Sequence, residues 1–141
     1  MRNYIMDLAF KLHIISTCAL IGLIWIVQIV HYPSFYFVED KRFVEFESFH
    51  KKSITTIVLP LMVTELVTGL VLLYFNRGVI HGINSLSIIL IWLSTFFISV
   101  PLHDKLSQTK SREDISNLVS TNWIRTALWS IRGVFIYHYF L

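Results

Sequence analysis

Charge and cysteine are both scarce in this chain of 141 residues. Asp, Glu, Lys and Arg make up 15% of the residues, whereas a soluble domain has about a quarter. The single cysteine, Cys18, can form neither an internal disulfide nor a thiolate metal cage, so CxxC redox chemistry is excluded. The chain also lacks a Gly-rich phosphate loop, a GxSxG elbow and a HExxH pair, so nothing in it indicates soluble hydrolase chemistry.

Long apolar runs are what the chain has in excess. Hydrophobic residues make up 55% of it, and the mean hydropathy is +0.63. A membrane-spanning helix needs about 20 apolar residues, so a chain of this length has room for about four spans and no separate soluble domain. We therefore predict an all-α fold, an integral membrane four-helix bundle that forms a single domain over residues 1–141. The predicted spans lie at about residues 7–31, 53–75, 83–100 and 122–141.

Prolines and aromatic residues set the expected ends of these spans. Pro33 ends the first span and Pro101 the third, because the residue before a proline is pushed out of the helical region. The segment 34–52 is rich in Phe and Tyr and mixes them with charged residues at helical spacing. It predicts a short amphipathic helix at the membrane interface between helices one and two, although a simple aromatic belt also explains it. Pro60 interrupts the second span and predicts a kink.

The basic residues indicate a membrane orientation. The net charge is +3, but these residues lie mainly in loops and at helix ends, so we expect no nucleic-acid partner. The segments 31–52 and 103–121 hold seven Lys and Arg residues, whereas the two chain ends and the 76–82 turn hold three. The positive-inside rule then predicts that both termini lie outside, as expected for a bacterial inner-membrane protein.

Polar and charged residues inside the spans are the strongest indication of a site. Asn122, Arg125, Trp129 and Arg132 share one stripe of the fourth span, and Glu65 lies at a similar depth in the second span. A charge at the bilayer centre costs at least ~2.5–3.5 kcal/mol, so such residues face a partner or a cavity. We predict a Glu65–Arg132 pair.

Two roles of this stripe remain open from the sequence. The pair is either a structural latch that holds the helix register, or part of a polar cavity. In the second case Arg125 and Arg132 hold an anionic ligand, such as a carboxylate or a porphyrin propionate.

Three histidines are expected at the loop face of the bundle. His31 ends the first span, His50 precedes the second and His103 follows the third. Imidazole is the commonest metal ligand in proteins, so this triplet predicts a transition-metal site that Glu47 or Asp104 could complete. The alternative is that each histidine is tolerated separately at a polar interface.

Two further histidines fall in the other half of the bundle. His13 in the first span and His138 in the fourth come to similar heights, and haem commonly binds between helices in such bundles. They predict haem b ligation. The alternative for His13 is a buried histidine that is hydrogen-bonded to a backbone carbonyl or a hydroxyl.

Short motifs in the first half of the chain resemble a known family. Lys11-Leu-His-Ile-Ile-Ser16 resembles the start of HemJ-type protoporphyrinogen oxidases, which are small haem-binding membrane proteins of bacteria. Leu59-Pro60-Leu-Met62 and Thr68-Gly69-Leu70 are similar to the proline-methionine and glycine-leucine pattern of that family. The resemblance implies that His13 ligates haem. It covers about half of the chain, and the stripe of the fourth span has no counterpart in that family.

A second resemblance concerns the loop face. His31-Tyr-Pro33 and Pro101-Leu-His103 resemble motifs of an uncharacterised bacterial family of four-span membrane proteins. That resemblance implies the fold and no activity.

The favoured function is a membrane protein that binds haem or a transition metal through histidines, in the role of an oxidoreductase. One alternative is a carrier or channel for a small solute, in which Glu65 and the arginines line a path. The other is a non-catalytic accessory subunit of a membrane complex. The expected partners are the lipid bilayer, a hydrophobic or anionic small molecule, and further copies of the chain or a larger complex.

Overall fold

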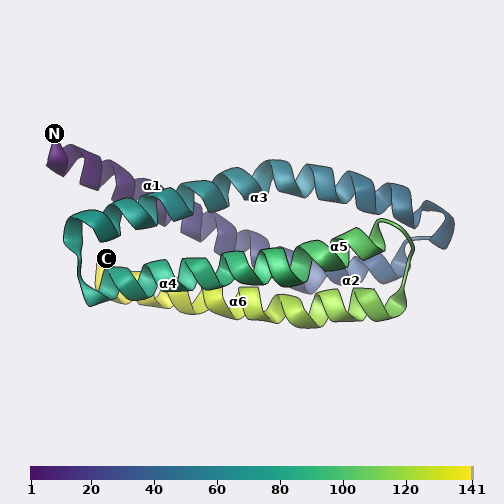
Figure 1. Cartoon of the computed structure of the whole chain (residues 1–141). Coiled ribbons are helices and arrows are strands. Elements are labelled where there is room, and N and C mark those ends of the chain that lie inside the picture. The colour runs from purple at the N-terminus through teal and green to yellow at the C-terminus, as the bar shows by residue number, and fades with distance from the viewer. Residues whose placement is uncertain (141) are drawn as a thin grey trace.

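The computed structural model describes the backbone of residues 1–140 and the side chains of residues 1–138. The described regular structure is helical throughout, and its elements follow one another as the rods Arg2–Phe37, Asp40–Asn76, Val79–Leu106 and Arg112–Phe140 (Figure 1). The elements are α1 (Arg2–Ile26), the π-helical η1 (Val27–His31), α2 (Tyr32–Ser34), the 3₁₀ turn η2 (Phe35–Phe37), α3 (Asp40–Asn76), α4 (Val79–Ser94), the π-helical η3 (Thr95–Ser99), α5 (Val100–Leu106) and α6 (Arg112–Phe140).

The rods pack against one another around an interior that combines a hydrophobic cluster with many polar side chains. α1 packs on α3 and α6, and α4 packs on α3 and α6. The turn between α3 and α4 lies at the same end of the molecule as both termini, whereas the loops before α3 and before α6 lie at the opposite end (Figure 1). Three rods are long and apolar enough to cross a membrane, namely Arg2–Phe37, Asp40–Asn76 and Val79–Leu106.

Two of the three prolines follow a short π-helical segment. η1 ends two residues before Pro33, and η3 ends two residues before Pro101. Proline lacks an N–H and its ring clashes with the carbonyl four residues earlier. In both cases that carbonyl lies inside the π segment, whose wider turns relieve the clash. The predicted helix ends at Pro33 and Pro101 are therefore wrong, because both helices continue past the proline.

The predicted separate amphipathic helix over residues 34–52 is also wrong. Most of that segment is the first part of α3, which runs without a break through Pro60 to Asn76. The buried residues of α3 fall into two groups, Phe43, Glu47 and His50 near its start and Met62, Glu65, Thr68, Gly69 and Leu72 in its second half. The helix is continuous between the two groups, so the interfacial segment and the second span form one helix.

The fourth helix begins ten residues before its expected start at Asn122. Its first residue is Arg112, and the hydroxyl of Ser111 accepts a hydrogen bond from the Asp114 N–H at 3.1 Å. A serine at this position satisfies a free N–H of the first turn, and Glu113 and Asp114 there complement the helix dipole. The expected start lies later because residues 112–121 show no hydrophobic periodicity.

Burial differs from that of a soluble protein in two ways. Buried positions include Glu47, Glu65, Arg125 and Arg132, whereas many large apolar side chains are exposed on the outside of every rod. Charged residues are almost never fully buried unless they are paired, and large exposed apolar surfaces mark contact with another apolar phase. The surface is thus compatible with insertion into a membrane.

Candidate functional site

A buried polar network joins the four rods in the half of the molecule that holds both chain termini, and we call it the central network. Arg132 Nη1 lies 2.6 Å from Glu65 Oε1, so the predicted pair is confirmed. Thr17 donates to the same carboxylate oxygen at 2.8 Å, and the Trp129 indole donates to Oε2 at 3.3 Å. The network consists of His13, Thr17, Glu65, Thr68, Asn84, Trp129 and Arg132.

His13 closes the network on the other side of Arg132. Asn84 Nδ2 lies 3.1 Å from His13 Nε2, and Arg132 Nη2 lies 3.4 Å from the same atom. Since Nε2 faces donors, Nδ1 carries the proton and donates to the Thr68 hydroxyl at 2.9 Å. Both ring nitrogens of His13 are occupied, so iron ligation would require one of these hydrogen bonds to break.

The other predicted haem ligand lies in a different environment. His138 is exposed on α6, next to an apolar surface hollow of about 470 Å³ lined with Ile131, Val134 and Phe135. His13 is only 2% exposed and faces the central network. Haem ligation by this pair stays a prediction.

Asn122, the first residue of the polar stripe, ties α6 to the first rod. Its side-chain amide donates to Gln28 Oε1 at 2.9 Å, and the Thr126 hydroxyl donates to the same oxygen at 3.3 Å. Gln28 in turn donates to the Val119 carbonyl. These contacts give Asn122 a structural role in the packing of η1 against α6.

The three histidines expected at the loop face do come together, in what we call the histidine cluster (His31, His50 and His103 with Tyr32 and Glu47). His31 Nε2 lies 2.7 Å from His50 Nδ1. His103 Nδ1 lies 2.6 Å from Glu47 Oε1, and the Tyr32 hydroxyl lies 3.0 Å from His103 Nε2. The rings of His50 and His103 are 5.3 Å apart between centroids. The cluster therefore consists of two hydrogen-bonded groups, the pair His31–His50 and the line Glu47–His103–Tyr32.

The cluster is not arranged as a metal site. Over the part of the chain that the structure describes, no group of three or more His, Cys, Asp or Glu is placed so that it could hold a metal ion. The ring nitrogens face one another, Tyr32 and Glu47, and do not converge on a common point. Asp104, the other candidate ligand, pairs with Lys51 at 2.6 Å. Metal binding by these histidines stays a prediction.

Arg125 differs sharply from Arg132. It is 6% exposed, donates to the Ser99 hydroxyl at 2.8 Å and lies over the Trp129 ring at 5.5 Å. Its Nε is buried without a hydrogen-bond partner. Among residues 1–138, no carboxylate lies within ion-pair distance of its guanidinium. Arg125 is a buried cation without an adjacent counter-ion.

Arg125 lines a cavity of about 270 Å³, which we call the inner cavity. Tyr32, Ser99 and His103 also reach its wall, and the Tyr32 hydroxyl interacts with the Arg125 guanidinium. The rest of the wall is mainly apolar, with Leu23, Val27, Val58, Leu59, Met62, Trp92, Phe96 and Val100. Such a cavity, apolar with a few convergent polar groups, is typical of a small-molecule site.

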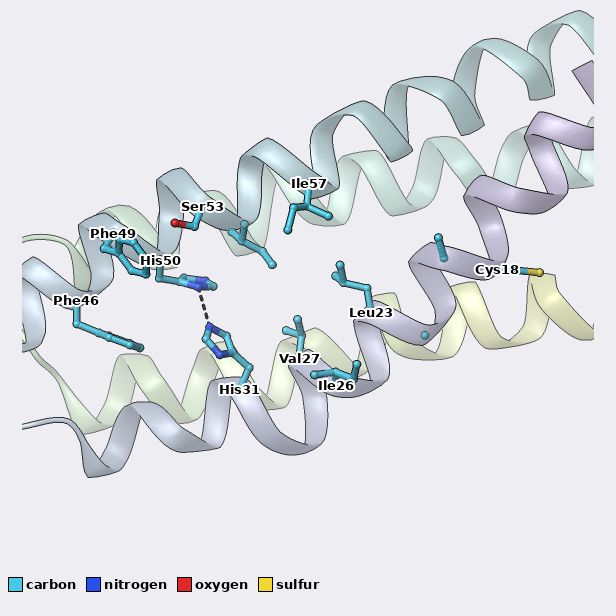
Figure 2. Close-up of a pocket in the computed structure, with 13 residues that line it drawn as sticks. Cys18, Leu23, Ile26, Val27, His31, Phe46, Phe49, His50, Ser53 and Ile57 are labelled. Carbon is cyan, nitrogen blue, oxygen red and sulfur yellow. Dashed lines mark hydrogen bonds between the residues drawn. The ribbon is translucent and has the colours of Figure 1, made fainter.

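A second hollow of about 590 Å³ opens between α1 and α3 on the far side of the same helix contact. Figure 2 shows the hydrogen-bonded His31 and His50 at one end and Leu23, Val27 and Ile57 along its walls. Leu23, Val27 and Ile54 line this hollow and the inner cavity alike. The two hollows are therefore neighbours and share part of one apolar wall.

Sequence reasoning missed Tyr32 and Ser99 as members of the site. Tyr32 directly precedes Pro33, and Ser99 is the last residue of the π segment before Pro101. π turns are frequent at functional sites because they rotate the residues that follow. The available signal is the pair of X-Pro positions in apolar runs, which by itself predicts helix ends and no site.

The fold and the site together define an all-helical protein with three helices of membrane-spanning length and apolarity and a buried polar interior. Comparison with protein-family models, with curated proteins and with solved structures gives no match to this chain. The resemblances to HemJ-type proteins and to the four-span family stay predictions from short motifs.

Proposed function

We propose that the chain is an integral membrane protein in which α6 forms the fourth span of a four-helix bundle. α6 buries Arg125 and Arg132 toward the other rods, while Ile124, Ile131 and Val134 are exposed on its outer side. A helix with inward charges and an outward apolar face is suited to the bilayer once partner helices cover the charges.

We further propose that this protein binds an amphipathic small molecule with a carboxylate-like head in the inner cavity. The observation that supports this is the buried Arg125 guanidinium, which lines the cavity without an adjacent counter-ion. A buried charge is very costly unless it is paired, and a guanidinium is well suited to a carboxylate. The apolar wall then takes the tail of the ligand.

A solute path through Glu65 and Arg132 has less support. Both side chains are saturated with hydrogen bonds inside the central network, and they are almost fully buried. The closed network favours the latch among the two roles considered for the pair. Ligand binding at Arg125 is compatible with a carrier or with an enzyme.

The test uses the quenching of tryptophan fluorescence by bromine. Trp92 lines the inner cavity, whereas Trp25 and Trp123 are largely exposed and are replaced by Phe to lower the background. The protein is reconstituted in lipid nanodiscs and titrated with 11-bromoundecanoate. We expect saturable quenching that Arg125→Gln weakens by about ten- to a hundred-fold in affinity, since a hydrogen bond to a charged group contributes about 1.5–3 kcal/mol.

Two controls accompany the titration. Arg112→Gln removes the same charge from an exposed site on the same helix and is expected to leave the affinity unchanged. The neutral 11-bromoundecanol is expected to bind much more weakly. Equal quenching by the alcohol, or unchanged affinity in Arg125→Gln, would contradict the proposed anion site.

The haem prediction has a separate test. Purified protein with bound haem would show a Soret band, and the prediction requires that His13→Ala removes it. A colourless, stable protein would exclude haem as a resident cofactor and leave the ligand site at Arg125 as the functional centre.

A further inference from the structure

Glu47, His103 and Tyr32 form a hydrogen-bonded line that leads to the inner cavity. Glu47 is fully buried and contacts His103 Nδ1 at 2.6 Å. His103 Nε2 lies 3.0 Å from the Tyr32 hydroxyl. Tyr32 is 4% exposed and reaches the cavity wall together with Arg125. The line thus begins at a buried carboxylate and ends beside a buried cation.

The direction of the hydrogen bonds along this line follows from the Glu47 carboxylate at its start, which can only accept. The Glu47 carboxylate accepts the Nδ1 proton of His103, so the neutral imidazole presents Nε2 as an acceptor. The Tyr32 hydroxyl then donates to Nε2, and its oxygen faces the Arg125 guanidinium at the cavity wall. This is the logic of a carboxylate–histidine pair that activates a hydroxyl, with a tyrosine in the place of the usual serine.

We propose that the inner cavity is an acid–base site, in which Tyr32 removes a proton from a hydrophobic carbon acid bound with its oxygen head at Arg125. The substrate class is a compound with an apolar tail and a C–H bond next to a carbonyl or nitro group. The proposal rests on the proposed ligand site at Arg125 and adds a reaction to it.

The proton and charge balance is internal to the site. The C–H bond of the ligand breaks, its proton passes to the Tyr32 oxygen, and the original Tyr32 proton passes to His103 Nε2. The electron pair of the broken bond moves onto the ligand oxygen. Two ion pairs result, the imidazolium of His103 with Glu47 and the ligand oxyanion with Arg125. Charge that develops beside a preorganised cation in an apolar site is strongly stabilised.

The test probe is 1-nitrononane, a neutral carbon acid whose nitronate anion has the shape of a carboxylate. The full chain is reconstituted in lipid nanodiscs in D₂O, and deuterium at C1 is followed by mass spectrometry. We expect exchange faster than in protein-free nanodiscs, and a loss of roughly a hundred-fold in Tyr32→Phe, the range typical of general acid–base groups. Tyr36→Phe, in the neighbouring turn, is the matched control and should exchange at the wild-type rate.

His103 and Glu47 are positioning residues in this scheme, because they act through Tyr32. His103→Asn and Glu47→Gln are expected to lower the maximal exchange rate and to leave the half-saturating concentration of 1-nitrononane unchanged. Arg125→Lys, which keeps the charge, should retain more exchange than Arg125→Gln. A loss confined to the half-saturating concentration would contradict the positioning role.

Binding of 11-bromoundecanoate separates this proposal from the ligand site itself. A Tyr32→Phe variant that still binds the acid but no longer promotes exchange supports the acid–base role and shows that the cavity is intact. Wild-type protein that binds the acid without promoting exchange overturns the acid–base role and leaves the ligand site standing. Equal exchange in wild type and Tyr32→Phe overturns the assignment to Tyr32.

Discussion

Arg125 and Arg132 lie on the same face of α6, about two turns apart, yet their surroundings differ. Arg132 is enclosed by Glu65, Asn84 and His13, which compensate its charge and fill its hydrogen-bonding positions. Arg125 has a serine hydroxyl and an indole ring beside it and faces a cavity. Arg125 is therefore suited to binding a ligand, and Arg132 to holding the structure together.

Glu65→Gln tests the structural role of the pair. The variant keeps the shape of the side chain but leaves Arg132 without its counter-ion, so we expect a loss of roughly 3–5 kcal/mol in the free energy of unfolding. The measurement is denaturation of the purified protein in mixed micelles. Asp7→Asn, which breaks the exposed pair with Lys11 (2.7 Å), is the control and should cost less than about 1 kcal/mol. Equal stability of the two variants would rule out the latch.

At the scale of the helices, short sequence features near the helix ends determine where each rod begins and in which direction its side chains point. The π segments before Pro33 and Pro101 let two rods pass their prolines. Both segments lie at the loop end, where they carry His31 and Ser99 into the site. The prolines thus shape the site and do not end the helices.

Ser111→Ala tests the early start of α6. The variant removes the acceptor for the Asp114 N–H, and the loss of such a cap costs about 0.5–2 kcal/mol. We expect faster amide hydrogen exchange in the first turn of α6 and a lower melting temperature. Ser116→Ala, at an exposed position inside the same helix, is the control. Unchanged amide hydrogen exchange at the start of α6 would mean that Ser111 does not cap this helix.

At the scale of the whole molecule, charged side chains are buried, large apolar ones are exposed, and both termini share one end with the turn before α4 (Figure 1). The opposite end carries the loops before α3 and α6, where the excess of basic residues lies. This arrangement is compatible with the predicted membrane orientation, since all the segments assigned to one side of the membrane lie at one end of the molecule.

Cysteine labelling in intact cells tests that orientation. In a Cys18→Ser background, Asn3→Cys is expected to react with a membrane-impermeant maleimide, because the positive-inside rule leaves the chain ends outside. Thr109→Cys, in the loop before α6, should react only after the cells are permeabilised. Both positions are exposed, so a difference reports the side of the membrane and not burial. Labelling of Thr109→Cys in intact cells would reverse the topology.

Much of the architecture was predictable from the sequence, because apolar runs and buried charges obey simple energetic rules. The all-helical fold, three of the four predicted long apolar helices and the Glu65–Arg132 pair follow from the cost of placing a charge or an unpaired backbone group in an apolar medium. The helix ends were predicted less well. A proline indicates a local break, whereas α3 continues through Pro60 and the two other rods pass their prolines after a π turn.

The sequence by itself determined the helical class and the set of polar residues that must be sheltered, since these depend only on composition and periodicity. Only the tertiary structure decided which of these polar residues find hydrogen-bond partners and a counter-ion. It closed His13, Glu65 and Arg132 into one network and left Arg125 at a cavity beside Tyr32. The difference between Arg132 and Arg125 depends on how each helix is rotated against its neighbours, by a fraction of a turn. The spacing of residues along the chain does not specify this rotation.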